Sequence, residues 1–600
     1  MKKILLSITF ALMGIASGFA AKAHTALTTI TQSDGSQLTI RLHGDEHFSW
    51  YSTADNVLLV QVGNNYYVAQ VEEDGTLKAT PQLAHNAGER GTVEEQVINN
   101  QNKEKFLNSL NAEPQALAKP IGTVTPAYFP HTGSPKALVI LVEFQDVKFK
   151  TSDPVATFTH YLKGADGEEA PEANNAYVTK GMVNYGSVSQ YFKDMSQGQF
   201  KPQFDIVGPV TVSKNSAYYG GNTGRTDANF AKMIAEACKG VSDKVNFADY
   251  DLNNDGYVDL VYVIYAGYSE SINGNSSDCL WPKSGTNAFY EPGTNNLLKL
   301  NGKRICRYGI NNELNGTPKN WIEGKPLLNG IGLFCHEFSH TMGLPDLYPT
   351  VETSRVDNQN PEYWDLMDGG EYTYSGYFPT PYSPWEMEVM GWTTPVELGD
   401  EAKQVNLNSY ASDRTTYKIN GKNDEYLLIQ NIQTDGWWRG ITKAYNTGML
   451  VWRIDYPYTT VSLDNRLNNE IGKPNVMIVP ADGYVISAYN VTDDDESKAK
   501  YKASLKADPF PGANNVPELL SVKLNKSTLK KPFYNIKETN GVITFDYLKD
   551  YATGIDQTLA DNDTEKNQSI FSLDGRYLGN DASKLTKGIY IIGKKKVVIK

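Results

Sequence analysis

The sequence predicts a multidomain α/β protein, in which a twisted sheet with helices is preceded by a separate folded block and followed by β-rich domains. Three observations favour this fold class. The 600 residues are too many for a single hydrophobic core. Apolar runs of strand length alternate with helical spacing between residues 130 and 398. Short alternating runs separated by Asn, Asp and Gly then fill residues 399–550.

Residues 1–23 have the composition of a signal peptide. Two lysines are followed by an apolar run over residues 4–20 and by small residues up to Ala23. This pattern predicts export, with cleavage near Ala20 or Ala23. No other apolar run approaches the length of a bilayer span, so we expect no membrane span. The expected location is secreted or cell-surface, after export through the inner membrane.

Residues 24–125 predict a mixed block that contains strands. The segment QLTIRLHGDEHFSWYSTADNVLLVQVGNNYYVAQV alternates apolar and polar residues and is interrupted by Gly, Asn and Asp. A polar stretch from about Thr92 to Ala118 favours helix. A folded block between a signal peptide and a further domain is most simply a propeptide. Its expected roles are latency and assisted folding.

Residues 130–398 are predicted to form a sheet with helices packed on it. ALVILVEF at 137–144 and VDLVYVIYAG at 258–267 are apolar runs of strand length. Between Phe230 and Gly240 the apolar residues follow helical spacing. A further helix is expected from about Asn329 to Met342, with Asn329 as its N-cap.

That last helix contains HEFSHTMGLPD at residues 336–346. His336 and His340 are one helical turn apart, so both imidazoles leave the same face and can hold one metal ion. Glu337 stands beside them, which completes the HExxH arrangement of zinc peptidases. Zinc lowers the pKa of its bound water, and Glu337 is the predicted general base that takes the water's proton and passes it to the leaving amine.

The third zinc ligand is predicted to be Asp346. Gly343 can adopt the left-handed conformation that ends a helix, and Pro345 prevents the helix from continuing, so the chain can bring Asp346 back to the metal. No histidine follows position 340. The alternative third ligand is a downstream Glu on a second helix.

A structural or inert site is the competing interpretation of these histidines. A structural zinc requires a fourth protein ligand, and Cys335 points away from both histidines on a regular helix. Three ligands and an open position indicate catalysis instead. The cysteines could form two disulfides in three connectivities or remain buried thiols: Cys238, Cys279, Cys306 and Cys335.

A second feature is WDLMDGGE at residues 364–371, where Met367 lies in a predicted tight turn. It resembles the methionine turn that forms a hydrophobic floor under the zinc histidines of metzincins. Together with HEFSHTMGLPDLY and with SPWEMEVMGW at 383–392, it resembles the immune inhibitor A family of secreted bacterial metallopeptidases. The resemblance extends from about residue 130 to about residue 515. It implies a metzincin-like zinc endopeptidase made as a latent preproprotein with its own propeptide.

The segment DLNNDGYVD predicts a calcium loop. Its residues match positions 1, 3, 5, 7 and 9 of the EF-hand loop, with Gly256 at the bend: Asp251, Asn253, Asp255, the Tyr257 carbonyl and Asp259. Position 12 is Tyr262 rather than Glu, and a strand follows instead of a helix. We therefore expect a stabilising Ca²⁺ site without an EF-hand fold, with a hydrogen-bonded Asx turn as the alternative.

The C-terminal third predicts two further parts. Residues 399–550 favour a β-sandwich-like domain, in which Trp437 and Trp438 either pack in the core or offer a sugar-stacking surface. Residues 551–600 contain a polar linker and short strands that resemble the C-terminal sorting domain of type IX secretion substrates. The alternative for this end is a small hairpin unit with a solvated lysine run.

Composition narrows the classes of partner. A net charge of −13 and a pI near 5.3 disfavour nucleic acid and anionic membrane surfaces. The predicted partners are protein or peptide substrates, the propeptide and the secretion machinery. The main hypothesis is a secreted zinc endopeptidase that hydrolyses extracellular proteins. Its rivals are a catalytically idle adhesin or calcium-stabilised scaffold on a peptidase fold, and a processing peptidase of narrow specificity.

Overall fold

The computed structural model forms two compact units, residues 1–549 and residues 550–600, which are described separately. It describes residues 17–551 and 569–599, except for residues 20–21, 25, 46–47, 112–128, 165–183, 223–226, 273, 321–323, 457–465, 493, 574, 580, 582–583 and 593–594. Most of the predicted signal peptide therefore lies outside the described residues, and that prediction stays untested. Among the described residues, no helix has the length and apolar composition needed to cross a membrane.

The larger unit is built on a six-stranded sheet with the order β1-β11-β14-β10-β8-β9. Its central strands are parallel, and β11 and β1 add to them antiparallel. The predicted apolar runs form β8 and β10. The strands are β1 (Ser17–Phe19), β8 (Lys136–Glu143), β9 (Gln203–Thr211), β10 (Val261–Tyr265), β11 (Lys283–Thr286) and β14 (Arg307–Asn312).

Both faces of this sheet are covered, which explains why β8 and β10 are continuously apolar. Tyr262 and Ile264 of β10 pack on one side with α3 (Pro154–Lys163), α5 (Val188–Met195) and α8 (Ile331–Thr341). Val261 and Val263, which alternate with them, pack on the other side with α7 (Phe230–Gly240). The predicted helix over 230–240 is therefore present and amphipathic in its packing.

Helix α8 begins differently from the prediction. Gly330 occupies the N-cap position and provides no side-chain cap. Asn329 instead donates to the side chain of Asn312 at 3.1 Å, so its prediction as the N-cap is wrong. The Ile331 amide, at the first position of the helix, donates at 2.8 Å to the side chain of Asn184, a residue far away in the sequence. A tertiary contact has replaced the local cap.

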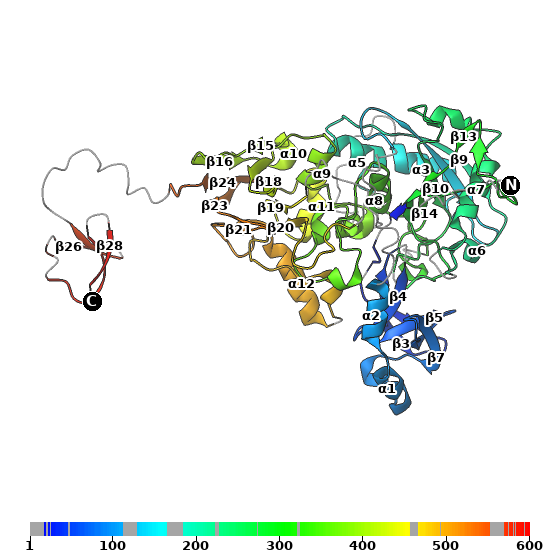
Figure 1. Ribbon diagram of the computed structural model, residues 1–600, viewed down its shortest axis with the longest axis horizontal. Helices are drawn as coiled ribbons and strands as arrows, with labels where there is room; N and C mark the ends of the chain where they lie inside the picture. Colours follow the sequence, from blue (N-terminus) through cyan, green and yellow to red (C-terminus); the bar gives the residue numbers. More distant parts are fainter. Residues whose placement is uncertain are drawn as a thin grey trace, which may run out of the picture. The chain divides into compact units, whose positions relative to one another are not determined.

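The predicted β-rich region forms a five-stranded and a three-stranded sheet, with orders β15-β17-β18-β19-β20 and β16-β24-β23. Leu428 and Trp452 face the core that includes α8, whereas Leu427 and Val451 face the three-stranded sheet. Figure 1 shows α8 between β10 and β14 on one side and β18 and β19 on the other. The strands are β15 (Val396–Glu397), β16 (Lys403–Leu407), β17 (Tyr417–Asn420), β18 (Tyr426–Ile432), β19 (Gly448–Ile454), β20 (Val476–Ile478), β23 (Phe533–Thr539) and β24 (Val542–Tyr547).

Trp437 and Trp438 belong to the core rather than to a surface. They are 3% and 1% exposed and pack in the same cluster as α8, so core packing is the alternative that holds. Trp438 starts α11.

The remaining elements of this unit are α6 (Ser216–Gly220), α9 (Pro384–Val389), α10 (Tyr410–Asp413), α11 (Trp438–Ala444), α12 (Asp495–Ala507), β12 (Lys299–Leu300), β13 (Lys303–Arg304), β21 (Val522–Lys523) and β22 (Thr528–Leu529).

The N-terminal block forms a separate antiparallel meander with its own core. Two helices follow its last strand, within the stretch where the sequence predicts helix. The elements are β2 (Thr28–Thr31), β3 (Gln37–Gly44), β4 (Ser49–Thr53), β5 (Leu58–Val62), β6 (Asn65–Val71), β7 (Leu77–Leu83), α1 (Thr92–Asn99) and α2 (Lys103–Asn111).

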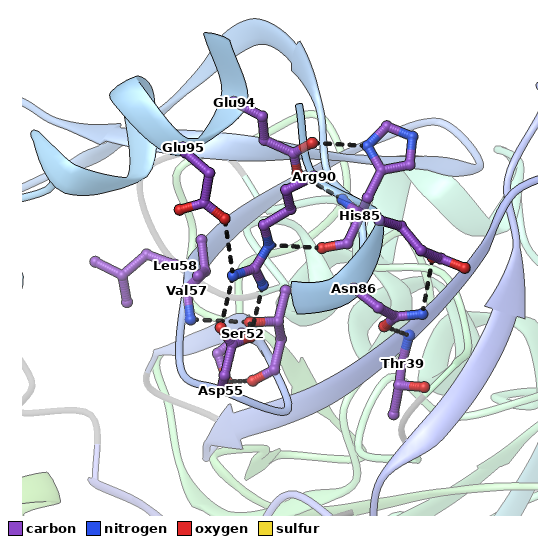
Figure 2. A network of polar contacts seen from close by, with 12 residues as sticks. Thr39, Ser52, Asp55, Val57, Leu58, His85, Asn86, Arg90, Glu94 and Glu95 are labelled. Carbon is purple, nitrogen blue, oxygen red and sulfur yellow. Dashed lines mark hydrogen bonds and ion pairs between the residues drawn. The ribbon is translucent and has the colours of Figure 1, made fainter. Parts of the chain in front are cut away.

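A polar network joins α1 to the meander (Figure 2). Arg90 donates from both terminal nitrogens to Asp55, each at 2.6 Å, and from Nε to the carbonyl of His85 at 3.0 Å. The His85 ring in turn contacts Glu94 of α1 at 2.9 Å. The Arg90 hydrogen bonds lower the pKa of Asp55 to about 2. Such a bidentate pair fixes the geometry of the turn between β4 and β5.

The four cysteines are free thiols in the structure, and two of them are buried, as the second predicted alternative expects, whereas Cys279 and Cys306 are partly exposed. Cys238 and Cys335 are buried in the helices α7 and α8. Burial raises the pKa of Cys238 to about 12, so this thiol is a packing residue rather than a nucleophile.

The smaller unit contains a four-stranded antiparallel sheet with the order β26-β25-β27-β28. Its strands are β25 (Ile570–Ser572), β26 (Tyr577–Gly579), β27 (Gly588–Ile592) and β28 (Lys595–Ile599). The short strands expected near the C-terminus are therefore present.

Candidate metal centre and active site

Three side-chain atoms converge at the C-terminal half of α8. The Nε2 atoms of His336 and His340 lie 3.2 Å apart, with the two rings perpendicular at 90°. Asp346 Oδ1 lies 3.2 Å from the first Nε2 and 3.4 Å from the second. All three residues are at most 1% exposed. The structure thus brings together the three ligands that the sequence predicts.

These distances fit a tetrahedral zinc ion. Ligand atoms about 2.0–2.1 Å from zinc at tetrahedral angles stand about 3.3–3.4 Å from one another. The other ring nitrogens are held by backbone carbonyls, with His336 Nδ1 3.1 Å from Leu366 O and His340 Nδ1 2.7 Å from Leu344 O. When Nδ1 of each histidine donates to its backbone carbonyl, the lone pair of Nε2 is free to bind a metal. Both Nε2 atoms then point to the position between them and Asp346 Oδ1, as in protein zinc sites.

The turn after α8 brings Asp346 to this point. Gly343 has φ +103°, in the left-handed region, and its amide donates to His340 O at 3.0 Å. This is the role that the sequence predicts for Gly343. The alternative ligand, a downstream Glu, finds its best candidate in Glu371, whose Oε2 lies 3.7 Å from His336 Nδ1. Because Nδ1 is on the opposite side of the ring from Nε2, the geometry favours Asp346.

The predicted methionine turn supports the ligands through its backbone. Met367 is fully buried, and its carbonyl accepts a 2.8 Å hydrogen bond from the amide of Leu347, the residue after Asp346. Leu366, its neighbour, accepts from Nδ1 of His336. The turn therefore connects both ends of the HEFSHTMGLPD segment. Its own shape is fixed by Asp365, which accepts from the Met367 amide at 2.7 Å.

The loop after this turn contains residues that the sequence analysis missed. Glu371 and Tyr372 lie in η6 (Gly369–Gly376), which packs closely on α8. A Cβ at Gly332 of α8 would lie 2.1 Å from Glu371 O, so only glycine permits this approach. Burial raises the pKa of Tyr372, and the charges of Glu371 and Glu337 contribute. Glu371 also brings its Oε2 to 3.7 Å from His336 Nδ1, and no sequence spacing indicates this contact.

A second unexpected group is the chain just before the N-terminal meander, where Lys22 and Ala23 end the predicted signal peptide and His24 begins the predicted propeptide. Lys22 forms a buried ion pair with Asp368, the residue after Met367. The Tyr372 hydroxyl donates to the Lys22 carbonyl at 2.9 Å. The His24 ring meets the Tyr372 ring edge-on, with centroids 5.0 Å apart. The segment 22–24 therefore lies against the loop that follows the methionine turn and contains Glu371.

Acidification is expected to loosen this segment, because desolvation and the charge of Lys22 lower the pKa of His24 to about 4. A free histidine has a pKa near 6.5, so a released segment takes up a proton between about pH 6.5 and pH 4 that the bound segment does not. The stabilisation is complete above about pH 6.5 and is lost as the pH falls through about 4. Amide exchange of residues 22–24 in the full chain should thus be faster at pH 5 than at pH 7, after correction for intrinsic rates.

The matched variants for this test are His24→Gln, which should remove the pH dependence, and His160→Gln, which changes an exposed histidine of α3 and should preserve it. An identical pH response in all three chains would contradict the assignment to His24.

The predicted calcium residues also come together. Carboxylate oxygens of Asp251, Asp255 and Asp259 lie within 4.8 Å of one another. Protein cations reach the same carboxylates, with Lys303 Nζ 2.6 Å from Asp251 and Arg307 2.7 Å from Asp255. The loop is further closed by Asx-type bonds, among them the Asp255 amide to Asn253 Oδ1 at 2.9 Å and the Tyr257 amide to Asp255 Oδ1 at 2.9 Å. Calcium at this loop stays a prediction.

Comparison with known proteins agrees with this site. Residues 128–392 match the sequence model of a family described as immune inhibitor A peptidase M6, catalytic domain. The matched range contains α8, the turn with Asp346 and the methionine turn.

Two kinds of relative are similar to the chain. Pre-pro-metalloprotease PrtV from Vibrio cholerae serotype O1, strains M66-2 and ATCC 39315 / El Tor Inaba N16961, is 24% identical over 281 residues, covering 42% of this chain and 29% of the relative. Immune inhibitor A from Bacillus thuringiensis subsp. alesti is 22% identical over 510 residues, covering 76% of this chain and 68% of the relative. The similarity thus spans less than a third of PrtV. At these low identities, the family match and the relatives support a metalloprotease function.

Proposed function

We propose that the chain is a secreted zinc endopeptidase that hydrolyses peptide bonds of extracellular proteins and is made as a latent preproprotein. One observation supports the proposal above all others. The Nε2 atoms of His336 and His340, on the helix that also carries Glu337, and Oδ1 of Asp346, in the turn after it, lie 3.2–3.4 Å from one another. Three protein ligands leave the fourth position open, as catalysis requires.

Each residue has a defined part in this proposal. A zinc ion held by the three ligands would polarise the scissile carbonyl and acidify a water molecule. Glu337 takes the proton from that water and returns it to the leaving amine. Leu366 and Leu344 hold the histidine tautomers through their carbonyls, and the methionine turn fixes the orientation of His336. The layout that we propose is metzincin-like.

Latency fits the contacts of the N-terminal block. Arg41 donates to the carbonyls of Ala488 and Tyr489 at 3.2 and 3.0 Å, and Ser49 donates to Glu270 at 2.8 Å. The zinc ligands and Glu337 are almost completely inaccessible in the full chain. We therefore propose that this block is the propeptide and that its displacement or removal opens the site.

The other predictions remain part of the same proposal. Export through the inner membrane, a type IX sorting role for residues 551–600, a structural Ca²⁺ at the Asp251 loop and contacts with the secretion machinery are all open to test. The β-rich sheets are proposed to shape the substrate site from the side of α8 that faces β18 and β19.

Metal removal tests the proposed function. The chain is matured by its own processing, stripped with a chelator, and assayed on an unfolded, reduced and alkylated protein. We expect cleavage to disappear when zinc is absent and to return with about one equivalent of Zn²⁺ per chain. Full activity in a preparation shown to be free of metal would overturn the proposal. Reconstituted zinc without any cleavage would favour the binding scaffold instead.

A further inference from the structure

The edge of the catalytic sheet already binds a peptide segment in this structure. Strand β1 pairs antiparallel with β11, with Ser17 opposite Thr286 and Phe19 opposite Ser284. Further along the same segment, the His24 amide donates to Ser271 O at 2.8 Å. Addition of a strand to a sheet edge is a general mode of peptide binding, in which the backbone gives affinity and the side chains give specificity. Residues 17–19 and 22–24 thus show how an extended chain can bind along this part of the fold.

The Lys22 side chain of this segment lies in a buried site whose carboxylate is held in a fixed orientation. The Lys22 side chain is 5% exposed and its ammonium contacts Asp368 Oδ1, on a carboxylate that is itself 0% exposed. The other oxygen, Oδ2, accepts the Glu362 amide at 2.7 Å and the Asn360 side chain at 3.0 Å. The protein therefore holds Asp368 in a fixed orientation, with Oδ1 directed at the cation.

The surroundings of the ammonium suit a basic side chain. Its nitrogen lies 5.7 Å from the ring centroids of both Tyr348 and Tyr489. Aromatic faces attract cations at this distance, and the attraction grows when water is excluded. The buried carboxylate of Glu362 belongs to the same cluster, because the Asn360 side chain donates both to it and to Asp368. We name Asp368, Glu362, Tyr348 and Tyr489 together the Lys22 site.

The Lys22 site is adjacent to the proposed catalytic groups. Asp368 directly follows Met367, in the turn whose Leu366 carbonyl holds His336. The main chain is placed as well, because Tyr372 donates to the Lys22 carbonyl at 2.9 Å and directly follows Glu371, whose Oε2 lies 3.7 Å from His336 Nδ1. A peptide that presents a basic side chain to Asp368 thus has its backbone next to the active site.

We propose that the Lys22 site is a substrate specificity site for a lysine or arginine side chain, and that Asp368 is the residue that determines the preference. The proposal rests on the peptidase function proposed above. Residues 22–24 leave either in part with the signal peptide, when cleavage follows Ala23, or later with the propeptide, when cleavage follows Ala20. In both cases Asp368 becomes a buried carboxylate without its cation. A substrate lysine or arginine restores the pair, whereas a neutral or acidic side chain leaves the charge uncompensated.

The test starts from the matured wild-type enzyme and an unfolded protein. Mass-spectrometric mapping of the cleavage sites should show Lys or Arg enriched at one fixed position relative to the cleaved bond. Synthetic peptides made from the best site should lose about 10-fold to 100-fold in kcat/KM when that residue is replaced by norleucine, and more when it is replaced by Glu. The competitor peptide SGFAAKAHTA, residues 17–26, should inhibit more strongly than its norleucine version.

Two Asp→Asn variants test whether Asp368 is the residue that determines the preference for a basic side chain. In Asp368→Asn, the ratio of kcat/KM for the lysine and norleucine peptides should fall towards one. Asp455→Asn removes the same charge at an ion pair with Lys526 and should keep the wild-type ratio. If Asp368→Asn does not fold, the wild-type mapping and the competitor pair still decide the question.

The outcomes separate the two proposals. A zinc-loaded, matured enzyme that cleaves the protein without any basic preference overturns the specificity site and leaves the peptidase function standing. An Asp368→Asn enzyme with an unchanged lysine-to-norleucine ratio also overturns it. An enzyme that cleaves nothing overturns the proposed function, and the specificity site with it.

Discussion

Replacing Glu337 with Gln is expected to lower kcat/KM for peptide hydrolysis by about 10³-fold to 10⁴-fold. The reason is that the Gln side chain has the same size and shape but cannot act as the general base. Each factor of ten corresponds to about 1.4 kcal/mol of transition-state stabilisation, so the loss is about 4–5.5 kcal/mol. Zinc should remain at about one per chain, because Glu337 is not among the three converging ligands. The measurement is kcat/KM on an unfolded protein or peptide, together with metal analysis of the same samples.

Glu388→Gln is the matched control for this variant. Glu388 lies in α9 and accepts from Lys418 at 2.6 Å, away from the zinc ligands, so its activity should stay within about 2-fold of the wild type. A zinc-loaded Glu337→Gln enzyme that keeps more than a tenth of the wild-type activity would contradict the assigned role.

Replacing Asp346 with Asn is expected to weaken zinc binding by more than about 100-fold, because a charged ligand is lost. Mutating a residue that only hydrogen-bonds to a metal ligand already lowers metal affinity by about 10-fold to 100-fold. Activity should fall with metal occupancy and recover in part at high zinc concentration. The measurement is a zinc titration against a competing chelator, with activity recorded at each occupancy.

Glu371→Gln distinguishes the two candidate third ligands. The Glu371 carboxylate approaches His336 at Nδ1 rather than Nε2, so this variant should bind zinc like the wild type. The reverse result, with zinc lost in Glu371→Gln and kept in Asp346→Asn, would establish the downstream Glu as the ligand.

Short-range periodicity is where the sequence was most informative. His336 and His340 share a helix face by spacing alone, and the residues that end the helix, Gly343 and Pro345, are local signals too. The apolar runs of β8 and β10 indicate strands covered on both faces for the same reason. In each case the deciding interaction lies within a few residues along the chain.

Contacts between distant segments could not be predicted in this way. The first turn of α8 depends on Asn184 rather than on the neighbouring Asn329. The small and apolar residues around Lys22 predict the end of an export signal, yet Lys22 pairs with Asp368 across the fold. Neither partner has a sequence feature that marks the other.

The sequence by itself determined the kind of chemistry, because metal ligation by a helix requires only the spacing of two histidines and a following turn. The sequence also favours Asp346 over a downstream Glu, and the structure places its Oδ1 with their Nε2 atoms. The tertiary structure alone decided that Glu371 approaches His336 at Nδ1 and that a buried Asp368 meets a lysine near this turn. The physical reason is that burial and charge pairing arise from the packing of separate elements, whereas periodicity is encoded locally.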